Sequence, residues 1–126
     1  MEGKKFLQLK DLGAYTTSFH LSNYVWDVVV KWEYLAKDTV GKQFIRAADS
    51  ISANIAEGFG RHGKNDRIKF YYYSLGSLNE ALDWNEKAKR RKIITSEQYD
   101  RILSELKKLP REINSLIKFT REKLTV

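Results

Sequence analysis

The chain contains a single proline, Pro110, and most of its seven glycines fall between Gly41 and Gly63. Few residues therefore interrupt a helix, and apolar residues recur at helical intervals over long stretches on both sides of these glycines. This pattern predicts an all-α protein made of a few long helices. A length of 126 residues suffices for one core, so we expect a single domain over residues 1–126.

The best-defined helix is the last one, predicted over residues 96–123. Thr95 and Gln98 stand in the spacing of a capping box, in which each side chain bonds the backbone amide of the other residue. Apolar residues then recur in phase on both sides of Pro110. The proline should therefore bend this helix near Lys107 rather than end it.

Two further helices are predicted upstream. One begins at Lys64 or Asn65 and ends in the basic tail KAKRRK at residues 87–92. The other spans residues 39–59, with Asp38 as its N-terminal cap. Both carry apolar residues at intervals of three and four, which would give each helix one buried stripe.

The segment YVWDVVVKWEYLA at residues 24–36 fits two kinds of structure. Its aromatic and β-branched residues alternate as they would in a strand, yet its apolar residues also fit a helix. A lone strand would have no partner in an otherwise helical chain, so we expect a helix over residues 22–37. The four helices would form one antiparallel bundle, with residues 1–20 as an N-terminal arm of uncertain order.

Residues 58–63, GFGRHG, match the dinucleotide-binding pattern G-x-G-x-x-G. That fingerprint requires a preceding strand inside a βαβ unit, whereas a helix is predicted here. The phosphate-binding loop of nucleotide hydrolases does not fit either, because no Lys-Ser or Lys-Thr pair stands at the required spacing. We expect Gly58 or Gly60 to end the helix in a left-handed conformation.

Positive charge gathers at both ends of the helix that follows these glycines. Lysine and arginine number 23 against 16 acidic residues, and the net charge of +7 favours polyanionic partners. The first cluster consists of Arg61, Lys64, Arg67 and Lys69, and the second of Lys87, Lys89, Arg90, Arg91 and Lys92. Either could bind phosphate, and either could simply be solvated charge or a complement to the helix dipole. About 37 Å would separate them at 1.5 Å per residue.

The stretch QFIRAADSISANIAEGFGR at residues 43–61 resembles a motif of a known family. These are four-helix bundle proteins first noticed as reading frames in intervening sequences of bacterial 23S rRNA genes, also called S23 ribosomal-type proteins. LGSLNE at residues 75–80 resembles their second motif, R-G-S-x-x-E, although Leu75 stands where an arginine is usual. The resemblance covers about residues 41–124, and the first 40 residues match only loosely. The matching positions are Arg46, Ser50, Asn54, Glu57, Gly58, Arg61, Gly76, Ser77 and Glu80.

This resemblance implies a fold and a mode of assembly, and no defined reaction. Relatives form ring-like homopentamers of four-helix protomers. The similar basic accessory proteins of diversity-generating retroelements bind nucleic acid and a reverse transcriptase. The chain is therefore expected to be a non-enzymatic homo-oligomer, with a pentamer as the first expectation, whose partners are RNA or other nucleic acid, or another protein.

The polar residues of the two motifs allow a structural and a catalytic interpretation. Glu57 can pair with Arg61 one turn later on the same helix face. We expect Asn54, Glu57, Ser77 and Glu80 to form a polar network inside the bundle, beside a glycine, Gly76, that lets another helix approach. A catalytic carboxylate pair would use the same residues, but no nucleophile or metal-type Glu-x-x-His pair accompanies them.

Other classes of site have little support in the sequence. The chain has no cysteine, and its two histidines, His20 and His62, have no partner in the sequence for a relay or a metal site, so we expect no metal or cofactor. No apolar run approaches the roughly 20 residues of a membrane span, and the start of the chain lacks the apolar stretch of a signal peptide. We expect a cytoplasmic protein without a membrane partner.

The sequence thus leaves two main hypotheses. One is a basic, self-assembled bundle that binds structured RNA through phosphates, and the other is an oligomeric interaction scaffold without direct nucleic-acid binding. The helix at residues 22–37 has more large apolar residues than one buried face needs, which predicts an interface between copies. Val29 is the residue that we expect on that interface.

Overall fold

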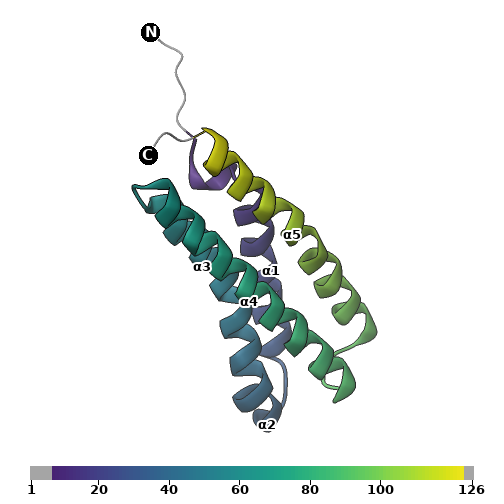
Figure 1. The fold of residues 1–126 in the computed structure, drawn as a ribbon. Helices are drawn as coiled ribbons and strands as arrows, with labels where there is room; N and C mark the ends of the chain where they lie inside the picture. Colours follow the sequence, from purple (N-terminus) through teal and green to yellow (C-terminus); the bar gives the residue numbers. More distant parts are fainter. Residues whose placement is uncertain (1–6, 124–126) are drawn as a thin grey trace.

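The computed structural model describes residues 7–123, and all of its regular structure is helical (Figure 1). A short 3₁₀ turn, η1 (Leu9–Asp11), precedes four long helices: α1 (Gly13–Val29), α3 (Lys42–Gly60), α4 (Lys64–Arg90) and α5 (Ser96–Lys123). A one-turn helix, α2 (Tyr34–Ala36), and a π-helical segment, η2 (Lys37–Gly41), lead into α3. The predicted all-α class with four long helices is confirmed for these residues.

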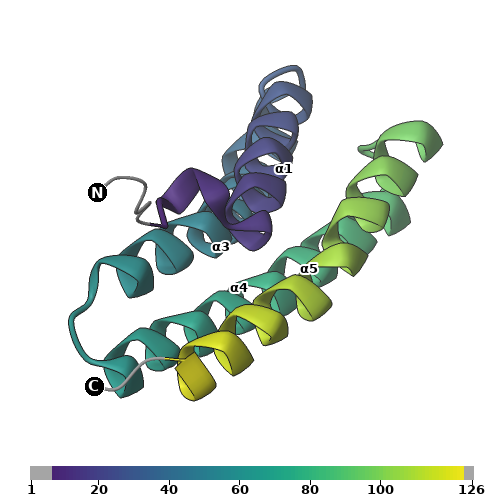
Figure 2. The same ribbon diagram turned by 90° about the horizontal axis from the view of Figure 1, so that it is seen from above.

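Consecutive long helices are neighbours in the bundle. α1 packs on α3, α3 on α4, α4 on α5, and α5 returns to pack on α1. The chain runs alternately up and down through these helices (Figure 1). Figure 2 shows two pairs, α1 with α3 and α4 with α5, which diverge toward one end. At that end the α1–α2 turn faces the α4–α5 turn.

One hydrophobic core joins all four helices. Its most deeply buried large side chains are Leu21, Val25, Val29, Phe44, Ile51, Ile55, Tyr71, Leu78, Ile102, Leu106, Leu109 and Ile113. Two buried polar side chains of α4 donate hydrogen bonds to other helices, and the Asn85 amide is one of them, with the Tyr99 carbonyl of α5 as its acceptor at 3.3 Å. The buried Ser74 hydroxyl of α4 donates to the Ile51 carbonyl of α3 over 2.8 Å.

The two C-terminal helices lie where the sequence predicts them. α4 starts at Lys64. The capping box of α5 is formed, since the Thr95 amide donates to Gln98 Oε1 at 3.2 Å and the Gln98 amide donates to Thr95 Oγ1 at 3.1 Å. α5 continues through Pro110, which therefore does not end it.

The first helix differs most from the prediction. It spans Gly13–Val29 rather than residues 22–37, so residues 13–20 belong to α1 and not to an arm, while residues 1–6 lie outside the described part of the chain. After Val30 the chain turns, and Trp32, 9% exposed, packs against the core from beyond the helix end. The apolar residues after Val29 predicted a longer helix. One of them, Trp32, is buried by a turn of the chain instead of by a further turn of helix.

The second predicted helix begins earlier than expected. Its backbone is helical from Tyr34 to Gly60 through α2, η2 and α3. Asp38 is therefore not a cap: it lies inside η2, and its carboxylate pairs with Lys42 Nζ at 2.8 Å. The π segment also lies close to α1, because a Cβ on Gly41 would stand 2.6 Å from Val29 Cγ1.

Candidate nucleic-acid interface

The α3–α4 cluster, Arg61, Lys64, Arg67 and Lys69, surrounds the turn between these helices. Arg61 pairs with Glu57 at 2.9 Å, as predicted, and lies 3.6 Å from Asp66. Lys69 pairs with the same Asp66 at 3.4 Å. Asp66 lies in the first turn of α4, where a carboxylate complements the helix dipole that would otherwise attract phosphate. Much of the positive charge of this corner is therefore offset from within.

The remaining members of the α3–α4 cluster also bond the chain itself. Arg67 Nε donates to the Arg61 carbonyl at 2.7 Å, and its guanidinium lies 5.7 Å from the Phe59 ring centre. Lys64 Nζ donates to the Arg121 carbonyl of α5 at 3.1 Å. These contacts fix the turn against both neighbouring helices, which is a structural use of the cations.

The α4-end cluster, Lys87, Lys89, Arg90, Arg91 and Lys92, divides into two groups. Lys87 pairs with Asp83 at 2.7 Å, and Lys89 Nζ lies 4.3 Å from the centre of the Tyr99 ring. The second group, Arg90, Arg91 and Lys92, is exposed, and within residues 7–123 these three side chains have no ion pair. They are the cations of the two clusters that remain available to a partner.

The turn that carries these cations has a defined geometry. The Ile93 amide donates to the Ala88 carbonyl and the Lys92 amide to the Lys89 carbonyl, each at 3.0 Å, which is the hydrogen-bond pattern of a Schellman cap. Lys92 takes the left-handed position of that cap with φ 60°, a place that glycine usually fills. Among the described residues other than glycine, it alone has a positive φ.

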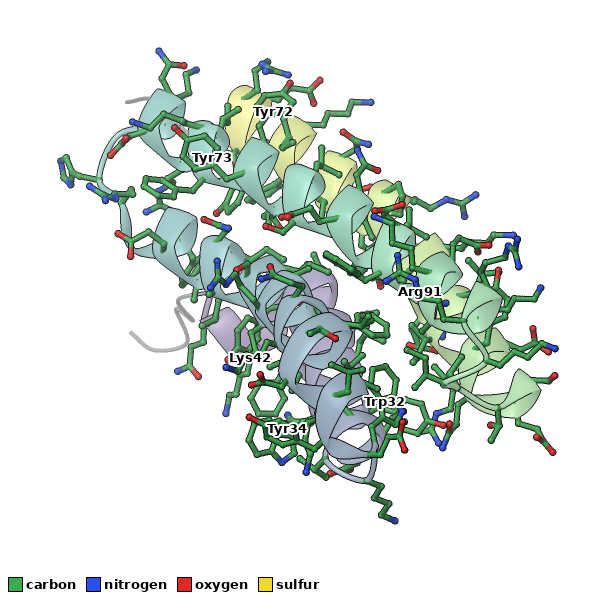
Figure 3. All side chains as sticks on the ribbon, turned by 90° about the horizontal axis from the view of Figure 1, so that it is seen from below. Trp32, Tyr34, Lys42, Tyr72, Tyr73 and Arg91 are labelled. Atoms are coloured by element: carbon green, nitrogen blue, oxygen red, sulfur yellow. The ribbon has the colours of Figure 1, made fainter. Side chains whose placement is uncertain are left out.

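A groove of about 520 Å³ lies between the two diverging ends of the bundle. The α1–α2 turn, α2 and η2 contribute Lys31, Trp32, Glu33, Leu35, Ala36 and Thr39, and the α4–α5 turn contributes Arg91, Lys92 and Ile93. Figure 3 shows Trp32 and Arg91 on opposite sides of this gap. No pattern in the sequence predicts the groove, because its walls lie about 60 residues apart in the chain and no spacing rule relates two turns.

The predicted internal polar network is wrong. Glu57 and Glu80 are exposed, and the Asn54 amide donates to the Ser50 carbonyl of its own helix at 2.9 Å. Ser77 is buried on α4 without a hydrogen bond to any of the other three residues. Arg46, which lies one turn before Ser50, is exposed as well. Nothing therefore joins these motif residues into a site within the described chain.

The two motif glycines have opposite surroundings. Gly58 is not a left-handed cap, because α3 continues to Gly60 without a positive φ. A Cβ on Gly58 would lie 2.7 Å from Tyr71 Cε1 and 2.9 Å from the Arg67 carbonyl oxygen, so the close approach of two helices occurs here. At Gly76 no heavy atom would lie within 4 Å of an added Cβ, and the predicted helix approach at that residue is absent from the protomer.

Exposed aromatic side chains gather on the outside of α4. Tyr71 is buried, whereas Tyr72 and Tyr73 are exposed and lie toward the end of α4 away from Arg91 (Figure 3). Tyr73 contacts the Phe70 ring edge to face at 5.3 Å, and the Arg61 guanidinium lies 4.6 Å from the same Phe70 ring. The aromatic surface therefore adjoins the α3–α4 cluster, whose charge is largely offset.

One hydrogen bond between α5 and α4 involves a titratable side chain of each helix. The Tyr99 hydroxyl donates to the Glu86 carboxylate, and the Lys89 ammonium lies over its ring. The hydrogen bond to Glu86, with a smaller contribution from burial, raises the pKa of Tyr99 to about 12.

Neither histidine belongs to a metal-type cluster of the described residues. His20 and His62 are both exposed, and residues 7–123 bring together no three His, Cys, Asp or Glu side chains in a metal-binding arrangement. No helix in the same range is long and apolar enough to span a lipid bilayer.

Comparisons with known proteins assign the chain to a family. The family model described as 23S rRNA-intervening sequence protein matches residues 10–115. The structure is similar to the crystal structure of a protein of unknown function from the S23 ribosomal protein family of Bacteroides thetaiotaomicron, with a TM-score of 0.74 and 26% identity, over 83% of this chain and 98% of that one. No curated protein matches the chain. The chain belongs to the family of 23S rRNA-intervening sequence proteins.

Proposed function

We propose that this chain is a non-enzymatic RNA-binding protein of the cytoplasm that contacts phosphates of structured RNA through Arg90, Arg91 and Lys92. The observation that carries the proposal is that these three exposed cations have no ion pair within residues 7–123. Such cations release counterions when they meet phosphates, and this release drives sequence-independent binding. The net charge of +7 and the family's link to 23S rRNA intervening sequences support an RNA ligand.

The α3–α4 cluster has a lesser role in this proposal. A phosphate there would compete with Glu57 and Asp66 for Arg61 and Lys69. Exposed ion pairs are weak, about 0–1 kcal/mol each, so the competition lowers affinity without forbidding contact. We expect this corner to add little to binding at physiological salt.

The test measures RNA affinity over a series of salt concentrations for a triple variant in which these three cations are replaced by a neutral residue. Replacing Arg90, Arg91 and Lys92 by Gln should lower the affinity for a structured RNA and reduce the slope of log K against log salt by about one per lost phosphate contact. A matched variant removes the same charge from α5 by replacing the exposed Lys107, Arg111 and Lys118 with Gln. If both triple variants lose affinity equally, the effect is net charge alone and the assignment to the turn is wrong.

A second candidate is an oligomeric scaffold without direct RNA binding. It is favoured by an exposed apolar stripe at helical spacing, formed by Phe19 (44% exposed) and Trp26 (54%) on α1 and by Val30 (37%) directly after its end. Exposed apolar surface of this kind typically marks an interface. We propose that this stripe joins copies of the chain, in a pentamer by resemblance to the family. Self-assembly is compatible with either function. The scaffold would be favoured if the wild-type protein bound no structured RNA at salt concentrations between about 50 and 200 mM.

A further inference from the structure

The groove between the two diverging ends combines positive charge with an apolar lining. Lys31, Arg91 and Lys92 are its cations and Glu33 is its one carboxylate. All four side chains are exposed, and in the described chain none of them has an ion pair. The lining thus has a formal excess of two positive charges, which suits an anion.

The apolar part of the groove comes from both sides. Trp32 and Leu35 form one side and Ile93 the other. Leu35 is 70% exposed, which leaves most of a large aliphatic side chain in water beside the cations. The volume of about 520 Å³ lies within the range of about 300–1,000 Å³ that is typical of small-molecule sites. A ligand that fills it therefore has an apolar body as well as negative charge.

We propose that this groove binds an unpaired nucleotide of an RNA strand, with the base against Trp32, Leu35 and Ile93 and the phosphate against Lys31, Arg91 and Lys92. This inference rests on the proposed function and narrows its ligand to RNA with single-stranded positions. A duplex keeps its bases stacked inside and presents mainly its backbone and groove edges, so the apolar side chains would meet nothing. An unpaired nucleotide offers a base face and a phosphate together.

The strained residue of the α4–α5 turn belongs to the same groove. Lys92 occupies a left-handed position that favours glycine, and it is one of the groove cations. Strain of this kind is frequent at functional sites. A glycine there would relieve the backbone and remove a phosphate contact, so the lysine is consistent with a binding role.

The experiment compares three ligands of equal length: a single-stranded RNA, the same strand with abasic nucleotides, and the duplex. Wild type should bind the intact strand more tightly than the other two. Leu35→Ser should lower affinity for the intact strand about fivefold, because it removes apolar contact with the base, and should leave the abasic strand unaffected. Tyr34→Ser is the matched control, since Tyr34 is 77% exposed and adjoins Leu35 in the chain but does not line the groove.

The outcomes separate this inference from the proposed function. Equal binding of all three ligands, with no effect of Leu35→Ser, would overturn the nucleotide groove and leave phosphate binding in place. Failure of every RNA ligand to bind would overturn both. Binding of polyglutamate as tightly as the intact strand would show that the groove takes acidic chains in general, and would also overturn the inference.

Discussion

A single methyl group would have opposite effects at two glycines of this chain. A Cβ added to Gly58 would lie closer to Tyr71 and to the Arg67 carbonyl than real Cβ atoms lie to any neighbour. The carbonyl belongs to the backbone, which cannot move aside as a flexible side chain can. Gly76 is itself exposed on α4, and a Cβ added to it would meet open space. Only the first glycine is required by packing inside the protomer, and the second lowers the helix propensity of α4.

The pair Gly58→Ala and Gly76→Ala tests this contrast. Gly58→Ala should lower the free energy of unfolding by about 1–3 kcal/mol, because α3 and α4 would have to separate. Gly76→Ala should raise it by about 0.5–1 kcal/mol. Urea unfolding followed by circular dichroism measures both. A loss of assembly in Gly76→Ala would show that its open face contacts another copy and would contradict the expected gain.

Lys92→Gly should make the protein more stable and a weaker RNA binder. Glycine relieves the left-handed strain, worth about 1–2 kcal/mol, which corresponds to a melting temperature higher by about 4–8 °C. Affinity should fall because one groove cation is lost. Lys92→Asn is the control, since asparagine also tolerates the left-handed region and also lacks the charge. If Lys92→Gly binds RNA as well as wild type does, Lys92 is not a contact.

Among the helices, those with local start signals are the ones that the sequence predicts correctly. α4 and α5 were predicted well because glycines precede α4 and the capping box of Thr95 marks α5. The predicted bounds of α1 are wrong because the Val-rich and aromatic run contains no residue that signals a helix end. Trp32 is buried after the turn, so it stands at a position that also fits one more turn of helix. The groove and the Gly58 contact depend on which helices meet, and the sequence of neither helix contains that information.

The α4–α5 connection should respond to alkaline pH through Tyr99. Its pKa rises from 10.0 to about 12 in the folded protein, so the folded state keeps the phenolic proton where the unfolded chain loses it. The stabilisation is therefore fully present below pH 10 and is lost as pH rises through 12. Melting temperatures between these values should fall more steeply for wild type than for Tyr99→Phe. Tyr73→Phe, at an exposed position, should behave like wild type.

In the folded protomer some large apolar residues remain outside the core, and contact between copies is expected at these residues. Val29, expected on the interface, is fully buried between α1 and the other helices, so Val29→Asp would unfold the protomer and say nothing about its partners. The stripe of Phe19, Trp26 and Val30 is exposed instead. It is the surface on which a change can alter assembly while leaving the core intact.

Trp26→Asp should therefore dissociate the oligomer without unfolding it. Light scattering should give a mass well above 14.8 kDa for wild type and a mass near 14.8 kDa for the variant, with unchanged helical circular dichroism. Tyr72→Asp places the same charge on another exposed aromatic residue, on α4. Dissociation by Tyr72→Asp alone would show that the interface lies on α4 and not on α1. A wild-type mass of 14.8 kDa would show that the protein does not assemble.

The π segment η2 also sets the angular phase of the residues that precede it. The wide turn of a π-helix holds about one residue more than an α-helical turn, so the loss of one residue from Lys37–Gly41 is absorbed by a return to α-helical geometry, with Tyr34 and Leu35 kept in phase with α3. Leu35 would then keep its place in the wall of the groove, and the core side chains of α3 would stay in place as well. An added residue has no such outlet and would rotate Tyr34 and Leu35 by about 100° relative to α3. One-residue insertions in η2 are thus expected to move Leu35 away from the groove, whereas one-residue deletions there are expected to leave it in place.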